Sequence, residues 1–199
     1  MSWQEFAALL LFCTAMSFSP GPNTTLSTAL AANGGLRRAL RFCLAVPAGW
    51  TLIMLASGLG LGALIASAPA LRWTIKLAGV GYMLWLAWKL AQSEQLAQAD
   101  SARLSIGFWQ GVGLQFLNIK AWMLALTLAA GWVAGQADAP QRLAIIVGVM
   151  LVYAFTSNFT YALAGALLRR WLAQGARLLW FNRAMAAVLV LTAFWMAQA

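Results

Sequence analysis

The sequence predicts an all-α membrane protein with six transmembrane helices, arranged as two inverted repeats of three helices each. Hydrophobic residues make up 63% of the 199 residues and charged residues only 9%, whereas soluble domains contain about 25% charged residues. Six apolar runs each approach the length of about 20 residues that a helix needs to cross a bilayer. Because the chain has too few polar groups to cover this apolar content, a soluble domain is excluded.

The predicted spans are connected by short loops. They cover residues 6–32, 43–66, 73–91, 107–134, 143–168 and 178–197. The first run is expected to be retained as a span and not cleaved as a signal peptide. The residues before it include the acidic Glu5 and no basic residue, and the run does not end in a small-x-small cleavage site. All spans form a single integral membrane domain, with repeat 1 over about 1–91, a polar cytoplasmic linker over 92–105 and repeat 2 over about 106–199.

Lysine and arginine are distributed unevenly between the two sets of loops. Nine lie near the loops after the first, third and fifth spans, namely Arg37, Arg38, Arg41, Lys89, Arg103, Arg169, Arg170, Arg177 and Arg183. Three lie near the opposite loops, namely Arg72, Lys76 and Arg142. Cytoplasmic loops are the richer in basic residues, so both termini are predicted to lie on the opposite, periplasmic side. The basic residues form no continuous stripe, so no nucleic-acid partner is expected.

The number of spans in each half predicts how the two halves are oriented. Because three is odd, homologous halves insert in opposite directions, as in many secondary transporters. The first span of each half is interrupted, by FSPGPNTT at Phe18–Thr25 and by FLNIKA at Phe116–Ala121. Ile119 stands where a proline would make the second interruption sharp. The sequence therefore predicts a true break in span 1, at Ser19–Asn23, and in span 4 either a weaker break or a continuous polar, charged helix.

The break in span 1 is a candidate substrate site. Pro20 and Pro22 free backbone groups that cannot remain unpaired in hydrocarbon, so the segment should face protein or a water-filled cavity. Asn23 and Thr24 are expected to cap a second half-helix, whose N-terminus would attract a carboxylate. The candidate substrate-binding residues here are Ser19, Pro20, Gly21, Pro22, Asn23 and Thr24. The alternative is a proline kink that serves helix packing.

Asn118 and Lys120 are the corresponding candidates in span 4. Lys120 is the only charged residue well inside a predicted span, where a lysine costs at least ~2.5 kcal/mol and is by default functional. We expect it to be the counter-charge for a substrate carboxylate. The alternative is that its long side chain reaches a membrane interface.

Span 5 carries a stripe of polar side chains. Tyr153, Ser157 and Tyr161 recur every four residues on one helix face, with Asn158 just beside it. These four candidates would bind the amine and the side chain of a zwitterion. Hydrogen bonding between helices is an equally open reading.

Several kinds of chemistry are excluded by missing residue types. The chain has no histidine, and its four acidic residues lie outside the predicted spans, so neither a buried proton relay of the usual kind nor a metal cluster is expected. It has no nucleotide-binding P-loop motif and no material for a hydrolase triad. Cys13 and Cys43 form no C-x-x-C pair and are expected to be buried bystanders. No enzyme activity and no cofactor are predicted.

Several motifs together resemble the LysE/RhtB family of bacterial amino-acid exporters. They are the Ser19–Asn23 segment with the Gly-Gly and basic loop after it, Lys76–Lys89, the region from Gly107 to Ala121, and Phe181–Met185. Leu114–Lys120 and Trp85–Lys89 are similar to the subgroup that exports cysteine and O-acetylserine.

The resemblance implies efflux of a small neutral amino acid from the cytoplasm across the inner membrane, driven by the proton gradient. Cysteine and O-acetylserine, or threonine and homoserine, are the implied types of substrate, and the lipid bilayer is the surrounding partner. Two other functions stay open: a passive channel or ion exchanger, and a non-transporting membrane interaction subunit. A homo-oligomer is also left open.

Overall fold

The computed structural model describes residues 1–60, 68–92 and 105–198, and within these ranges the regular structure is entirely helical. The helices are α1 (Trp3–Phe18), α2 (Pro22–Gly34), α3 (Leu36–Gly58), α5 (Pro69–Ala91), α6 (Phe108–Leu117), α7 (Ile119–Leu128), the π-helical turn η1 (Ala129–Val133), α8 (Ala139–Leu172) and α9 (Arg177–Gln198). Nearly all of the predicted linker, and the end of the second predicted span, lie outside the described residues.

Three of these helices, α3, α8 and α9, are long and apolar enough to cross a membrane. In the same part of the chain, α6 together with α7 and η1 makes a fourth candidate, as one bent span. The apolar helix α1 has 16 residues, and α5 is not among the helices that satisfy both length and hydropathy. The all-helical, membrane-type fold is therefore confirmed, with up to four spans by this measure.

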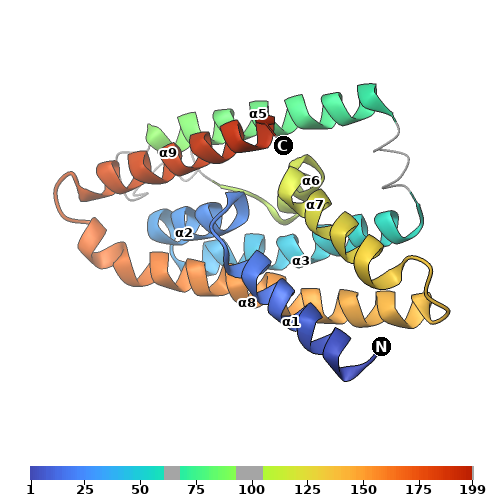
Figure 1. Cartoon of the computed structure of the whole chain (residues 1–199). Helices are drawn as coiled ribbons and strands as arrows, with labels where there is room; N and C mark the ends of the chain where they lie inside the picture. The colour runs from blue at the N-terminus through green and yellow to red at the C-terminus, as the bar shows by residue number, and fades with distance from the viewer. Residues whose placement is uncertain (61–67, 93–104, 199) are drawn as a thin grey trace.

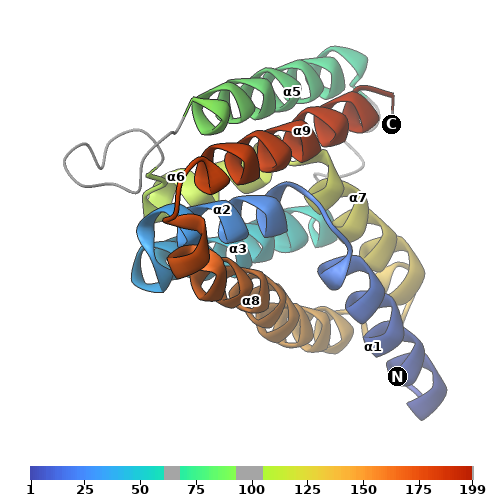
Figure 2. The ribbon, with the colours of Figure 1, turned by 90° about the vertical axis from the view of Figure 1, so that its left-hand side faces the viewer.

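The helices form two groups around a central pair. Helices α2 and α3 lie between α8 on one side and the neighbouring helices α5 and α9 on the other (Figures 1 and 2). One buried cluster joins α2, α3, α5, α8 and α9. A second joins α1, α3, α7 and α8 at the other end. Segments from both halves of the sequence thus share each core.

Helices α2 and α8 approach each other closely at Gly165. A Cβ atom there would collide with the backbone carbonyl of Thr28 on α2, and a backbone atom cannot move aside as a flexible side chain can. Gly148 lies in the same helix, but a Cβ atom there would meet nothing within 4 Å. The pair therefore separates the effect of helix contact from that of glycine replacement.

We expect Gly165→Ala to destabilise the fold and Gly148→Ala to leave it unchanged or slightly more stable. Overpacking costs about 1–3 kcal/mol, which corresponds to a fall in the unfolding midpoint of roughly 2–12 °C for a chain of this size. The measurement is thermal unfolding of both variants in the same detergent. Equal midpoints would contradict the close approach of α2 and α8.

The predicted break in span 1 is present. Helix α1 ends at Phe18 and α2 begins at Pro22. Gly21 is the N-cap: its N–H donates to the Thr24 hydroxyl at 3.0 Å, and that hydroxyl lies 3.0 Å from the Gly21 carbonyl. The prediction that Asn23 and Thr24 are N-cap residues is wrong for both, because Pro22 occupies the first helical position, where its fixed φ and missing N–H are tolerated. Thr24 instead lies within the first turn and supports the cap through its bonds to Gly21.

The second interruption is sharper than the sequence predicted. Helix α6 ends at Leu117, α7 begins at Ile119, and the two axes differ by 69°. Asn118 has an extended backbone (φ −90°, ψ 99°), and its side-chain oxygen accepts the Lys120 N–H at 3.1 Å. An asparagine side chain thus satisfies the first turn of α7 as an N-cap does. Span 4 is broken without a proline, which rules out a continuous helix.

Charged residues join the beginning of α1 to the beginning of α8. Arg142 lies 3.2 Å from the carboxylate of Glu5 and 2.6 Å from that of Asp138. The hydrogen bond from Arg142, with a second from the terminal ammonium, holds the pKa of Asp138 below its usual value. This ion cluster joins the N-terminal ends of α1 and α8.

Candidate functional site

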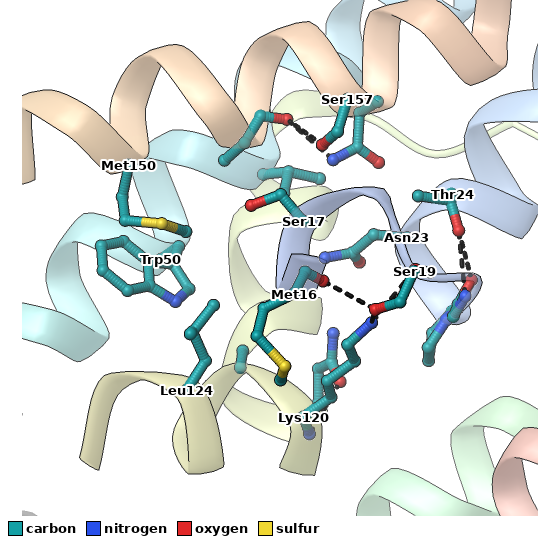
Figure 3. Close-up of a pocket in the computed structure, with 17 residues that line it drawn as sticks. Met16, Ser17, Ser19, Asn23, Thr24, Trp50, Lys120, Leu124, Met150 and Ser157 are labelled. Carbon is teal, nitrogen blue, oxygen red and sulfur yellow. Dashed lines mark hydrogen bonds between the residues drawn. The ribbon is translucent and has the colours of Figure 1, made fainter. Parts of the chain in front are cut away.

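A small pocket lies where the two breaks meet α3 and α8 (Figure 3). It encloses ≈ 60 Å³, and a single water needs about 10–15 Å³ measured in this way. The pocket therefore has room for a few waters or for a small solute. Its position at two interrupted helices is where membrane transporters place polar backbone safely away from lipid.

Most of the residues that the sequence singled out line this pocket. They are Ser19, Gly21, Pro22, Asn23, Thr24, Asn118, Lys120, Ser157 and Asn158. Pro20, Tyr153 and Tyr161 are not among its lining residues. The fold thus brings the two predicted breaks together with part of the span 5 stripe.

Lys120 connects the two breaks. Its ammonium donates to the Ser19 hydroxyl at 2.7 Å and to the Ser19 carbonyl at 3.1 Å. The side chain does not reach for a membrane interface, since it crosses from α7 to the backbone that the first break frees. None of the described residues lining the pocket is acidic. The ammonium is therefore a positive charge with neutral partners, open to an anion.

The N-termini of α2 and α7 both adjoin the pocket. The first turn of α2 contains Pro22, Asn23 and Thr24, and the first turn of α7 contains Lys120 and Ala121. Helix N-termini carry a partial positive charge and attract anions. Two such ends beside one ammonium concentrate positive potential in a space with no carboxylate of its own. A carboxylate is the chemical group that this arrangement favours.

Asn23 is held by Gln115, which the sequence did not indicate as a candidate site residue. Its amide exchanges two hydrogen bonds with Gln115 of α6, of 2.8 and 3.2 Å, and Gln115 also donates to the Gly111 carbonyl at 3.1 Å. Gln115 is fully buried. A lone glutamine three residues before a helix break in an apolar run was the signal that could have identified it. It positions Asn23 and so the first turn of α2.

The span 5 candidates have divided roles. Asn158 accepts a hydrogen bond of 2.9 Å from Ser27, and Ser157 bonds weakly to its own helix at 3.4 Å. Tyr161 donates to the Phe18 carbonyl at 2.9 Å, and Tyr153 accepts from Thr14 at 3.1 Å. Both tyrosines thus form hydrogen bonds between α8 and α1, as expected if the polar stripe of span 5 serves helix packing. Only the serine and the asparagine face the pocket.

The remaining wall of the pocket is largely apolar and was not predicted. It consists of Met16, Ser17, Val46, Trp50, Ala121, Leu124, Met150 and Ala154. In Figure 3, Trp50, Met150 and Leu124 lie together, away from Thr24 and from the contact of Lys120 with Ser19. The pocket thus has a positively charged polar end and an apolar side. Such a site suits a small molecule with one anionic end and an uncharged remainder.

Metal and thiol chemistry find no support in the described part of the chain. Within it, no three histidine, cysteine or acidic residues come close enough to hold a metal ion. Cys13 and Cys43 are buried free thiols, and neither lines the pocket. Their buried positions agree with the expectation of bystander cysteines.

Membrane-length apolar helices, two broken helices and a charged pocket between them are the features of a membrane transport protein. The chain belongs to the LysE type translocator family, whose sequence model matches residues 14–198. This membership makes the protein a transporter rather than an enzyme. No solved structure matches the chain.

Curated relatives agree with this family membership. A cysteine/O-acetylserine efflux protein of Klebsiella pneumoniae is 32% identical over 189 residues, which is 92% of each chain. The protein of the same name from Escherichia coli (strain K12) is 32% identical over 87% of this chain and 88% of its own. That of Salmonella typhimurium is 32% identical over 77% and 78%. The resemblance to exporters of this family is thus confirmed over most of the chain.

Proposed function

We propose that the protein exports small neutral amino acids from the cytoplasm across the bacterial inner membrane. The observation that carries this proposal is the Lys120 ammonium, which lies between two helix N-termini in a pocket without acidic lining residues among those described. Every amino acid offers a carboxylate to such a site. The names of the relatives, cysteine/O-acetylserine efflux proteins, supply the substrate class, and threonine or homoserine is a further candidate.

The charge and size of the pocket support a neutral, small substrate. A lysine- or arginine-like side chain would bring a second cation beside Lys120, and no acidic residue among the described lining residues would offset it. A pocket volume of ≈ 60 Å³ agrees with a small solute. The substrate amine would meet the hydroxyl of Ser157, another residue that lines the pocket, while its side chain would lie against the apolar wall.

The proposed transport cycle uses both breaks. We infer six spans in two inverted repeats, with Ser19–Asn23 in the first repeat and Asn118–Lys120 in the second, and both termini periplasmic. The bond from Lys120 to Ser19 joins the repeats across the proposed site. A substrate carboxylate would compete for that ammonium and loosen the connection, and rocking of one repeat against the other would expose the site to the opposite side. The proton gradient is the proposed driving force.

Overexpression followed by mass spectrometry of the medium tests the function. We expect excess extracellular cysteine or O-acetylserine, with threonine, homoserine and lysine in the same panel. Excess lysine alone would contradict the neutral substrate class, and no excess of any amino acid would contradict export.

Proteoliposomes separate a transporter from the two other candidate functions. A transporter shows saturable, stereoselective counterflow, in which unlabelled substrate inside drives uptake of labelled substrate. A passive channel shows flux without saturation or counterflow. A non-transporting interaction subunit shows neither, and cellular efflux would be untouched by changes in the pocket.

A further inference from the structure

Trp50 is a buried donor in the wall of the pocket that has no hydrogen-bond partner among the described residues. It lies in α3, its side chain is 3% exposed, and its indole nitrogen is left unpaired. Two other indoles of this region are satisfied: that of buried Trp122 donates to the Phe116 carbonyl at 2.9 Å and that of partly buried Trp132 to the Glu5 carbonyl at 3.2 Å. An unpaired buried donor costs about 1–3 kcal/mol, so a bound molecule that accepts a hydrogen bond from this nitrogen would be stabilised at this point of the pocket.

A second unpaired donor lines the same pocket. The hydroxyl of Ser17, near the end of α1, is also buried without a partner in the part of the chain that the structure describes. Together, Trp50 and Ser17 offer an N–H and an O–H from two different helices. Two unsatisfied donors in one small cavity indicate that an acceptor on the bound molecule completes it.

The surroundings of Trp50 decide which acceptor fits. Trp50 packs in the apolar cluster with Leu124 and Met150, apart from the contact of Lys120 with Ser19 (Figure 3). An anion placed among these side chains would be desolvated without a counter-charge. The carboxylate therefore belongs with Lys120 and the helix ends, and a neutral oxygen or sulfur belongs with Trp50.

We propose that Trp50 and Ser17 are specificity-determining residues that donate hydrogen bonds to a neutral acceptor atom in the substrate side chain. The inference rests on the proposed export of amino acids and deepens it: the favoured substrates are small amino acids with a carbonyl, hydroxyl or thiol group on the side chain. Purely aliphatic amino acids of equal size leave both donors unpaired and bind less well. Carbonyl oxygen is the strongest of these acceptors and sulfur the weakest.

The test compares matched substrates in proteoliposomes that contain the full chain. Serine and 2-aminobutyrate differ by a hydroxyl in place of a methyl group. O-acetylserine and 2-amino-5-methylhexanoate have side chains of the same shape, in which the ester and carbonyl oxygens of the first are a methylene and a methyl group in the second. In the wild type we expect a lower KM for the acceptor-bearing member of each pair. Trp50→Phe keeps a ring but removes the N–H, and should raise the KM for that member by roughly tenfold while leaving the aliphatic member unchanged.

Two further variants are needed: Ser17→Ala as a second test and Trp109→Phe as a control. Ser17→Ala should reduce the same preference, and it serves as the test if the tryptophan variant fails to fold. Trp109 is 79% exposed and outside the pocket, so Trp109→Phe should keep the wild-type ratio. An unchanged ratio in folded Trp50→Phe and in Ser17→Ala overturns the proposal while export stands. If the wild type transports no member of either pair, the proposed function itself fails.

Discussion

Lys120→Met is expected to reduce amino-acid export by roughly 10- to 150-fold in kcat/KM, because a charged hydrogen bond is worth about 1.5–3 kcal/mol. The side chain keeps much of its length and apolar volume but loses the ammonium that bonds to Ser19. Without this charge, a substrate carboxylate would enter a pocket that offers only helix ends. The measurement is saturable counterflow in proteoliposomes.

Two further lysine variants make this result specific. Lys76→Met removes a lysine of α5 whose ammonium lies 5.0 Å from the centre of the Trp73 ring, away from the pocket, and should transport normally. Lys120→Arg keeps the charge on a longer, planar group and should retain part of the activity. Full transport by folded Lys120→Met would show that the carboxylate binds elsewhere.

Gly21→Val should impair transport strongly and Gly21→Ala mildly. A Cβ atom at Gly21 would lie 3.3 Å from the ammonium nitrogen of Lys120 and 3.5 Å from its Cδ. The backbone there is extended, with φ −178°, so any residue can adopt it and the effect comes from occupied space alone. The flexible lysine can yield to one methyl group but not to a branched side chain without leaving Ser19. Overpacking of this kind costs about 1–3 kcal/mol, which would lower the affinity for the substrate by roughly 5- to 150-fold.

Gly113 provides the control for these variants. It lies in α6, and a Cβ atom there would meet nothing within 4 Å. Gly113→Val and Gly113→Ala should therefore keep the wild-type KM. The decisive comparison is the substrate KM of the two valine variants at equal amounts of folded protein. Equal values would mean that Gly21 does not shape the site.

The first break could be predicted because its cause is local. Pro20 and Pro22, two residues apart, prevent one helix from continuing through the segment, and the structure ends α1 at Phe18 and begins α2 at Pro22. The capping residue could not be assigned in the same way. Gly21, Asn23 and Thr24 are all acceptable near a helix start, and only the folded backbone places Gly21 at the cap and Thr24 as its partner.

The second break was underestimated because asparagine is ambiguous within a helix. Asn118 can remain in a continuous helix or turn its side chain onto the next backbone N–H, and the two states differ little locally. In the structure, the bend of 69° is accompanied by the bond from Lys120 to Ser19, 101 residues away in sequence. A preference that depends on such a distant partner has no signature in the local residues.

The sequence by itself determined the membrane class from composition, the first break from a proline pair and the family from several motifs together, and it singled out Lys120 as a candidate because a charge stands in an apolar run. Only the tertiary structure decided which side chains share the pocket. Trp50 and Met150 look like any other apolar residues of membrane helices, and the tyrosines of span 5 look like ligands. The direction in which a side chain points depends on how α1, α3, α7 and α8 pack, and that packing joins residues from both ends of the chain.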